Sequence, residues 1–332
     1  MAKTAIAGVE LEPWEITQLQ QVFPDGKFSS AHVVDAGNLG NPEALIIFIY
    51  SPITKDVLAK LPNLKMVATM STGFDHIDLA ACQARGITVA NVPSYGENTV
   101  AEHALALLLA LSRKIVPSVN QTRHGDFRLD GLRGIDLAGK TAGIVGTGRI
   151  GRHFIAMVKG LGMKVIAYDP RPQPDLAQEL GFTYVDLETL LSTSDAVSLH
   201  APATTDTFHL LNAQRLLLMK PTAFLVNTAR GTLIETKGLV AALEAGKLAG
   251  VGLDVLEEEC VIREERELLS KVFQQQCDLQ VAYADHLLLE HPKVIITPHN
   301  AFNSQEALKR ILDTTIANVQ AWQVGQPVNV VH

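Results

Sequence analysis

The chain has 332 residues, a length that suits two domains. Its net charge of −7 argues against nucleic acid as a partner, and its aromatic content of 5% argues against a platform for stacking single-stranded bases. The three cysteines, Cys82, Cys260 and Cys277, are odd in number and unevenly spaced, which predicts reduced thiols in a cytoplasmic protein, with neither a disulfide framework nor a metal site.

The beginning of the sequence shows no targeting pattern. Met1–Val9 leads directly to Glu10 and Glu12 without the apolar core of a signal peptide. The most apolar stretch, Ala101–Ile115, is too short and too charged to cross a bilayer. We therefore expect no membrane partner.

Short apolar runs alternate with helical patterns along the chain, as is typical of α/β proteins with parallel sheets. The predicted strands are Thr4–Val9, Ala44–Ile49, Lys65–Met70, Ile87–Asn91, Ala142–Gly146, Val165–Asp169, Ala196–His200, Ala223–Asn227, Val251–Asp254 and Val294–Thr297. Apolar residues at helical spacing predict a long helix over Glu97–Ile115, and we expect another over Gln305–Gln323 with no strand after it. The polar, glycine-rich stretch Arg123–Leu137 is expected to be a loop or arm.

A dinucleotide-binding fingerprint follows the strand predicted at Ala142–Gly146. Gly146, Gly148 and Gly151 are spaced for a tight turn, for close approach of the backbone to a pyrophosphate and for close packing of the next helix. Asp169 ends the next strand, where its carboxylate can accept the ribose hydroxyls and would repel a 2′-phosphate. The pattern therefore favours NAD over NADP. A glycine-rich turn without a ligand is the alternative, which the complete order of strand, turn, helix, strand and acid disfavours.

The position of this motif indicates the domain organisation. It begins near residue 140, so a first domain of about 100 residues must precede it. We predict two Rossmann-like or flavodoxin-like α/β domains with parallel sheets and a cleft between them. Residues 1–100 plus 300–332 would form the substrate domain, and residues 101–299 the NAD-binding domain.

Three further strand ends carry side chains suited to the reduction of a 2-oxo acid. Arg230 follows one strand and can bind a carboxylate with its planar fork; Asp254 and Glu259 follow another; His299 comes after a proline at the third. The histidine would exchange the hydroxyl proton, and a carboxylate would orient its ring. A solvated histidine and a surface arginine are the plain alternatives, but their appearance together behind a dinucleotide fold favours the catalytic interpretation.

These motifs resemble the D-isomer-specific 2-hydroxyacid dehydrogenases over nearly the whole chain. The resemblance rests on Gly146–Gly151, Asn227–Gly231, Leu253–Glu259 and Thr297–Ala301. It implies that Arg230 binds substrate, that His299 is the acid/base and that Glu259, at the family's spacing from Asp254, pairs with it in preference to Glu257 or Glu258. It also implies cofactor contacts at Arg149, Ile150, Asp169, Ala201, Pro202, Thr207, Thr228, Ala229 and, on the nicotinamide side, Asp254.

Within the family the likeness is closest to the D-lactate dehydrogenase subgroup. That resemblance implies that Thr72 and Gly73 grip the substrate carboxylate through their backbone N–H groups, and that Tyr95 and Phe302 face a small pocket, with ordinary packing as the alternative for Tyr95. The chain departs from the pattern at Cys260, where proline is usual, at Asn303, where an aromatic residue is usual, and in the long stretch 260–298. That stretch is predicted to cap the cleft, to extend a subunit contact or to be decoration.

We therefore predict an NAD-dependent reductase of small 2-oxo acids, with pyruvate and D-lactate as the leading pair. Hydroxypyruvate, glyoxylate or a bulkier 2-oxo acid is the nearest alternative, and an NAD-sensing corepressor-type protein is the alternative from another class. Relatives of formate dehydrogenase are disfavoured because they have glutamine where Glu259 stands. The resemblance also implies a homodimer formed through the nucleotide domain, with the arm around Phe127 as a contact.

Overall fold

The computed structural model describes residues 4–32, 39–257 and 278–331. The chain forms two compact units, one of Met1–Gly96 with Asn303–His332 and one of Glu97–Phe302. It passes from the first unit to the second at Gly96–Glu97 and returns at Phe302–Asn303. We had expected the boundaries after residues 100 and 299, and the role of each unit stays a prediction.

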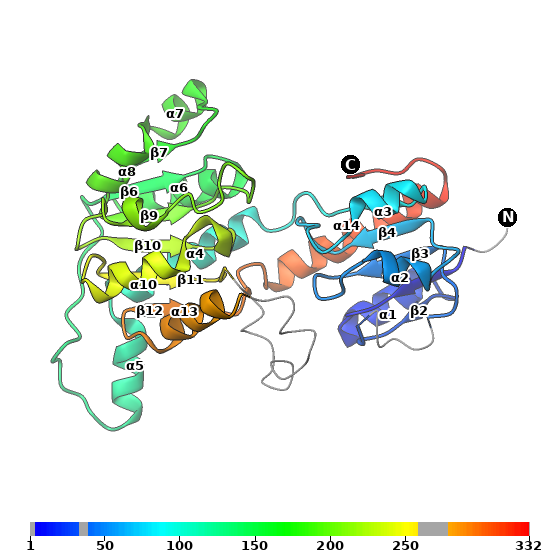
Figure 1. The fold of residues 1–332 in the computed structure, drawn as a ribbon, viewed down its shortest axis with the longest axis horizontal. Helices are drawn as coiled ribbons and strands as arrows, with labels where there is room; N and C mark the ends of the chain where they lie inside the picture. The colour runs from blue at the N-terminus through cyan, green and yellow to red at the C-terminus, as the bar shows by residue number, and fades with distance from the viewer. Residues whose placement is uncertain (1–3, 33–38, 258–277, 332) are drawn as a thin grey trace. The chain divides into compact units, whose positions relative to one another are not determined.

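The first unit contains a five-stranded parallel sheet in the order β2-β1-β3-β4-β5 (Figure 1). Its strands are β1 (Ile6–Gly8), β2 (Lys27–Phe28), β3 (Ala44–Ile47), β4 (Met66–Thr69) and β5 (Thr88–Ala90); its helices are α1 (Pro13–Val22), α2 (Lys55–Ala59), α3 (Leu79–Ala84) and α14 (Gln305–Gln323). This order is that of flavodoxin-like folds.

Local signals start these helices. Pro13 occupies the first turn of α1, and Glu12 and Glu15 form a capping box there. The side chains of Thr54, Asp78 and Ser304 accept backbone N–H groups at the starts of α2, α3 and α14. Strands β3 and β4 are wholly buried, as expected for parallel strands covered on both faces, and α14 packs against β4.

The second unit contains a seven-stranded parallel sheet in the order β12-β11-β10-β9-β6-β7-β8 (Figure 1). Its strands are β6 (Thr141–Val145), β7 (Lys164–Tyr168), β8 (Thr183–Tyr184), β9 (Ala196–Leu199), β10 (Phe224–Asn227), β11 (Gly250–Leu253) and β12 (Val294–Ile296). Its helices are α4 (Glu97–Ser112), α5 (Ile115–Arg123), α6 (Arg149–Gly160), α7 (Pro174–Leu180), α8 (Leu187–Thr193), α9 (Ala213–Leu216), η1 (Gly231–Leu233), α10 (Thr236–Glu244) and α13 (Leu279–Glu290).

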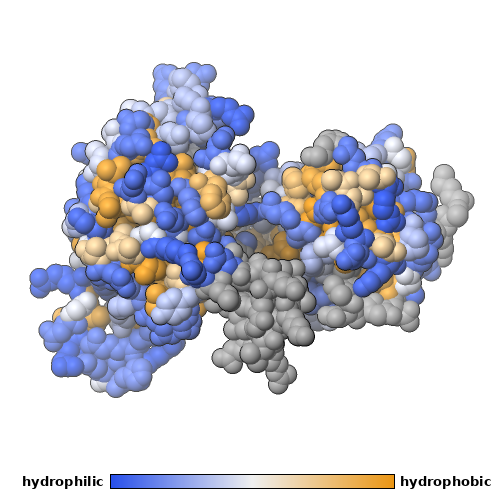
Figure 2. Space-filling view, in the orientation of Figure 1, coloured by the Kyte–Doolittle hydropathy of each residue, from blue (hydrophilic) through white to orange (hydrophobic). Residues whose placement is uncertain are grey.

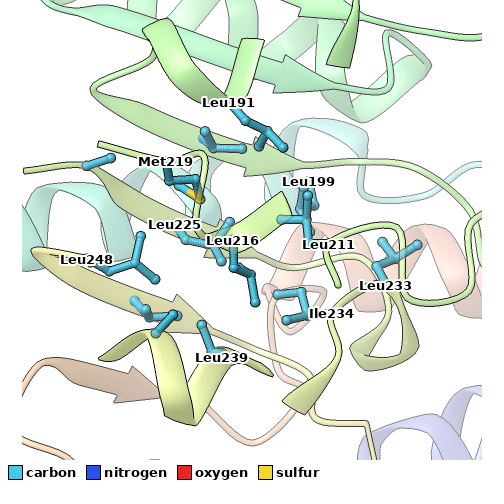
Figure 3. Close-up of a cluster of buried hydrophobic side chains, with 14 of the residues drawn as sticks. Leu191, Leu199, Leu211, Leu216, Met219, Leu225, Leu233, Ile234, Leu239 and Leu248 are labelled. Atoms are coloured by element: carbon cyan, nitrogen blue, oxygen red, sulfur yellow. The ribbon is translucent and has the colours of Figure 1, made fainter. Parts of the chain in front are cut away.

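Two apolar clusters cover the two faces of this sheet. Alternate residues of β10 divide between them: Leu225 belongs to one cluster, and Phe224 and Val226 belong to the other. The first cluster joins the sheet to α8, α9 and α10 (Figure 3), and the second joins it to α4 and α6. Hydrophilic residues cover the visible surface of α7, at the top of Figure 2, as expected for a peripheral helix.

Most predicted elements are confirmed. Every predicted strand is present, and α14 has the predicted bounds. The helix predicted over Glu97–Ile115 was too long, because Lys114 adopts a left-handed conformation (φ 55°) that ends α4 and lets α5 begin at Ile115. The two-residue strands β2 and β8 and helix α13 were not predicted. No helix of the described residues is long and apolar enough to span a membrane.

Candidate functional site

The strand order of the second unit reverses at β6, which lies between β7 and β9. In open α/β sheets ligands bind at the carboxyl ends of the strands beside such a switch point. The turn after β6 carries Gly146 and Gly148, and the segment after β9 carries Ala201 and Pro202. The structure thus brings these predicted cofactor residues to one edge of the sheet.

Glycine occupies each of the three positions of the turn for a different physical reason. Gly146 has φ +93°, and a Cβ there would lie 2.8 Å from the backbone of His200. Gly148 caps α6, and a Cβ on it would meet no described atom within 4 Å, so its backbone is open to a ligand. A Cβ on Gly151 would lie 2.1 Å from the carbonyl oxygen of Gly146, so only glycine lets α6 start this close to the turn.

Asp169 lies beside this turn and is held by it. Its Oδ2 accepts the backbone N–H of Thr147 at 2.8 Å and the Thr147 hydroxyl at 3.0 Å, while Oδ1 accepts the N–H of Arg171 at 2.9 Å. Thr147 Oγ1 also lies 2.8 Å from the hydroxyl of Tyr184. The acid at the end of β7 is therefore oriented toward the glycine turn, and its predicted contact with the ribose stays a prediction.

The residues around the turn fit a dinucleotide. In addition to the open backbone at Gly148, the buried hydroxyl of Thr228 has no hydrogen-bond partner among the described residues, so a ligand could satisfy it. Arg149, in the first turn of α6, has an exposed side chain that lies 3.5 Å from Glu97. Thr207 instead supports its own loop, since its hydroxyl donates to the carbonyl of Pro202 at 2.7 Å.

His200 packs beneath the turn against Phe154, with ring centroids 5.0 Å apart, and its Nε2 lies 2.9 Å from the hydroxyl of Ser198. Burial lowers the pKa of His200 to about 3, so the ring is neutral at physiological pH. His200 was not predicted to have a role, and its neutral ring suits packing against the glycine turn.

Asp254, directly after β11, organises the turn that carries His299. Its buried carboxylate accepts the Thr297 hydroxyl at 2.5 Å and the N–H groups of Asn300 and Ala301 at 3.0 and 2.8 Å. The N–H of His299 donates to the carbonyl of Asp254 at 2.8 Å. These bonds hold His299 at φ +51°, a conformation that costs a non-glycine residue strain and often marks functional sites.

His103 of α4 supports the same turn, a role that was not predicted from the sequence. Its Nε2 lies 2.9 Å from the Thr297 hydroxyl and 3.4 Å from Asp254 Oδ1. No spacing rule connects a helix residue to a turn so far along the chain. The predicted contact of Asp254 with the nicotinamide stays a prediction.

Two members of the predicted catalytic triad, Arg230 and His299, lie among the described residues. Arg230, half-buried, follows β10 and donates from Nη1 to the carbonyl of Ala229 at 2.8 Å. Glu259 lies outside the described residues. Glu257 accepts from His209 at 2.5 Å and from the N–H of Thr236 at 3.0 Å, so its carboxylate already has a structural role. That observation is consistent with the choice of another glutamate as the partner of His299.

The predicted substrate residues divide between the units. Thr72 and Gly73 lie in the first unit, in the bend after β4. Tyr95, half-buried, belongs to the same unit, and its carbonyl accepts Nε of Arg310 at 2.5 Å. Phe302, also half-buried, is the last residue of the second unit.

The glycine turn, the acid at the end of β7 and the parallel sheet are the features of an α/β domain that binds a dinucleotide. Residues 105–301 match the model of the NAD-binding domain of the D-isomer specific 2-hydroxyacid dehydrogenases. The chain belongs to this family of NAD-dependent oxidoreductases, which act on the CH–OH group of 2-hydroxy acids.

Similar proteins carry different names within the family. The chain is 39% identical over 286 residues to a glycerate dehydrogenase of Methylorubrum extorquens, covering 84% of this chain and 82% of that protein. It is 38% identical over 288 residues to a D-lactate dehydrogenase of Escherichia coli, covering 86% and 84%.

Solved structures of the family share its fold. The D-lactate dehydrogenase of Aquifex aeolicus, complexed with NAD and lactic acid, has a TM-score of 0.84 and 34% identity over 97% of this chain and 96% of that one. The pyruvate reductase of Chlamydomonas reinhardtii has a TM-score of 0.89 and 34% identity, covering 98% of each chain. NAD is therefore the cofactor of this chain, and the names leave its particular 2-hydroxy acid to be assigned.

Proposed function

We propose that this enzyme reduces a small 2-oxo acid with NADH, and that pyruvate, giving D-lactate, is its principal substrate. The observation that carries the proposal is the turn in which the buried carboxylate of Asp254 holds His299 in a strained conformation at the carboxyl edge of the NAD-binding sheet. A D-lactate dehydrogenase and a pyruvate reductase among the similar proteins support pyruvate as the substrate.

Each residue then has one task. Bound NADH supplies the hydride that the carbonyl carbon receives. Protonated His299 donates its proton to the carbonyl oxygen, which becomes the hydroxyl of the product, and Glu259 stabilises the protonated ring. Arg230 binds the substrate carboxylate and stabilises the charge that grows on the carbonyl oxygen. Thr72 and Gly73 of the first unit bind the carboxylate through backbone N–H groups. Tyr95 of the first unit and Phe302 of the second face the small substituent.

The test is the oxidation of NADH against a panel of 2-oxo acids, with the chirality of each product determined. Strong pyruvate turnover giving only the D-isomer is expected. The variant His299→Ala is expected to lose turnover while it still binds NADH, because the proton donor does not contribute to cofactor affinity. Equal loss of turnover and of NADH binding would refute the acid/base role.

Hydroxypyruvate is the second candidate substrate, and the 39% identity to a glycerate dehydrogenase favours it. Reduction of hydroxypyruvate gives glycerate by the same chemistry, so the catalytic residues would keep their tasks. A kcat/KM for hydroxypyruvate above that for pyruvate would select this candidate and would move only the assignment of the residues facing the substituent.

We further propose that the enzyme is a homodimer formed through the arm Arg123–Leu137 together with α5, the helix that precedes it. Apolar side chains of the arm and of α5 are exposed in the single chain, with Phe127 at 78%, Leu129 at 84%, and Val116 and Val119 at 40% each. Exposed apolar groups clustered along one short segment are typical of an interface. A second copy would cover them, and sedimentation analysis would report the dimer.

A further inference from the structure

The bend after β4 presents three consecutive backbone N–H groups. The carbonyl oxygen of Ser71 accepts the N–H of Val92 at 3.0 Å, and that of Thr72 accepts Nδ2 of Asn91 at 2.8 Å. The carbonyl oxygen of Gly73 accepts the hydroxyl of Ser71 at 2.6 Å. Three carbonyl groups in a row are therefore held by named partners.

Because the peptide unit is planar, the bonds to these carbonyl groups also fix the directions of the N–H groups that follow them. In a trans peptide the C=O of one residue and the N–H of the next point in opposite directions, and the described chain has no cis peptide bond. The N–H groups of Thr72 and Gly73 consequently point away from Val92 and Asn91, and the N–H of Phe74 points away from the Ser71 hydroxyl. None of the three finds an acceptor among the described residues.

Asn91 is itself fixed from behind. Its carbonyl oxygen accepts Nδ2 of Asn318, a fully buried residue of α14, at 2.8 Å, and its N–H donates to the carbonyl of Asn329 at 3.1 Å. Nδ2 of Asn329 in turn donates to Oδ1 of Asn318 at 2.8 Å. Asn91 and Asn318 are buried, so each needs a partner within the protein, and these bonds fix the position from which Asn91 reaches Thr72.

The hydroxyl of Ser71 has a similar support. It has one proton, which it donates to Gly73, so the 2.7 Å contact between Ser71 Oγ and Thr69 Oγ1 requires Thr69 to be the donor. Both hydroxyl groups are buried. Thr69 therefore donates to Ser71, and Ser71 donates to Gly73, so the carbonyl group of Gly73 is held in one orientation.

We propose that Asn91 and Ser71 are positioning residues of an anion cradle formed by the N–H groups of Thr72, Gly73 and Phe74, with Asn318 holding Asn91 in place. Unpaired N–H groups in succession bind an anion through their partial positive charges. The cradle takes the carboxylate of the 2-oxo acid, an assignment that rests on the proposed function. Phe74 is a donor that sequence reasoning did not identify, because its N–H is aimed by a hydroxyl three positions earlier.

The experiment compares Asn91→Leu and Ser71→Ala with wild type, on the 2-oxo acid that the wild type reduces best and on the corresponding 2-oxo amide. Leucine matches the size of asparagine but cannot donate to Thr72. We expect Asn91→Leu to raise KM for the acid by about ten-fold, as the loss of one hydrogen bond to a charged group predicts, with kcat and the KM for NADH changed less than about two-fold. The amide, which has no charge, should be affected less.

Ile311→Val is the control, because Ile311 is a buried residue of α14, the helix that carries Asn318, and an isoleucine side chain forms no hydrogen bond. Loss of stability alone would give this control the same KM for the acid as Asn91→Leu, and that result would overturn the proposal. Equal effects on acid and amide would also overturn it. Ser71→Ala is a smaller change, for which we expect KM for the acid to rise about three-fold. This variant tests the proposal if Asn91→Leu fails to fold. A wild type inactive on every 2-oxo acid would instead refute the proposed function; the cradle would then be tested by oxamate binding to the NADH-saturated protein.

Discussion

A substitution can separate two roles for Asp254, which are to organise the turn that carries His299 and to contact the nicotinamide. The substitution Asp254→Asn keeps the size of the side chain and replaces one carboxylate oxygen with an NH₂ group. In the wild type, Oδ1 accepts the Thr297 hydroxyl and the N–H of Asn300, and Oδ2 accepts the N–H of Ala301. Whichever way the amide is turned, its NH₂ group therefore faces at least one donor.

The magnitude follows from the better of the two orientations, in which the NH₂ group faces Ala301. One buried N–H then loses its acceptor, which costs about 1–3 kcal/mol, and the two remaining bonds lose the strength that the charge gave them. Asp254 is 1% exposed, so water cannot replace the lost partner. We expect the free energy of unfolding of Asp254→Asn to be about 2–4 kcal/mol lower than that of the wild type.

The assay is urea unfolding without NADH, together with the dissociation constant of NADH. If Asp254 organises the His299 turn, the cofactor-free variant loses stability and kcat falls. If Asp254 acts only by contacting the nicotinamide, unfolding without cofactor is unchanged and only the NADH dissociation constant rises. A wild-type unfolding midpoint for the cofactor-free variant would therefore refute our account of the turn.

Three further predictions concern other parts of the molecule. Asp169→Ala is expected to relax discrimination against NADPH, measured as the ratio of kcat/KM for the two cofactors, and an unchanged ratio would remove Asp169 from the ribose site. Burial raises the pKa of Glu15 from 4.5 to about 7, so the protonated carboxyl stabilises the fold fully below pH 4.5 and this contribution is lost as the pH rises through 7. Glu15→Gln should abolish that loss, which is no more than about 3 kcal/mol, in unfolding measured between pH 5 and 8; a parallel pH dependence in both proteins would contradict it. Phe127→Ser with Leu129→Ser should give monomers by sedimentation, and a persistent dimer would place the interface elsewhere.

The sequence was informative wherever the signal is local. The strands are short apolar runs, and the roles of Gly146, Gly148 and Gly151 depend on spacing within a single turn, so both could be predicted from neighbouring residues. The strands β2 and β8 are two residues long and carry too little apolar pattern to be recognised. The start of α5 depended on a left-handed lysine, which no propensity rule predicts.

The supports of the site were beyond such reasoning because they join residues far apart in the chain. His103 contacts Thr297, and Asn91 contacts Asn318. Each is a polar residue next to an apolar run, a position that is occupied far more often by a solvated side chain. Only the packing of α4 against β11, and of α14 against β4, brings these partners together.

In both units a buried polar side chain directly after one strand bonds the segment after the neighbouring strand. The side chain is an acceptor in one unit and a donor in the other. Asp254 directly follows β11 and bonds the turn after the neighbouring strand β12; Asn91 directly follows β5 and bonds the bend after the neighbouring strand β4. The carboxylate of Asp254 is an acceptor, so it consumes the N–H groups of its turn, which is left to present the His299 side chain. The amide of Asn91 donates to a carbonyl, so the N–H groups of its bend stay available. With the roles that we propose, the accepting side chain leaves a turn that offers a proton carrier, and the donating side chain leaves a bend that offers an anion site.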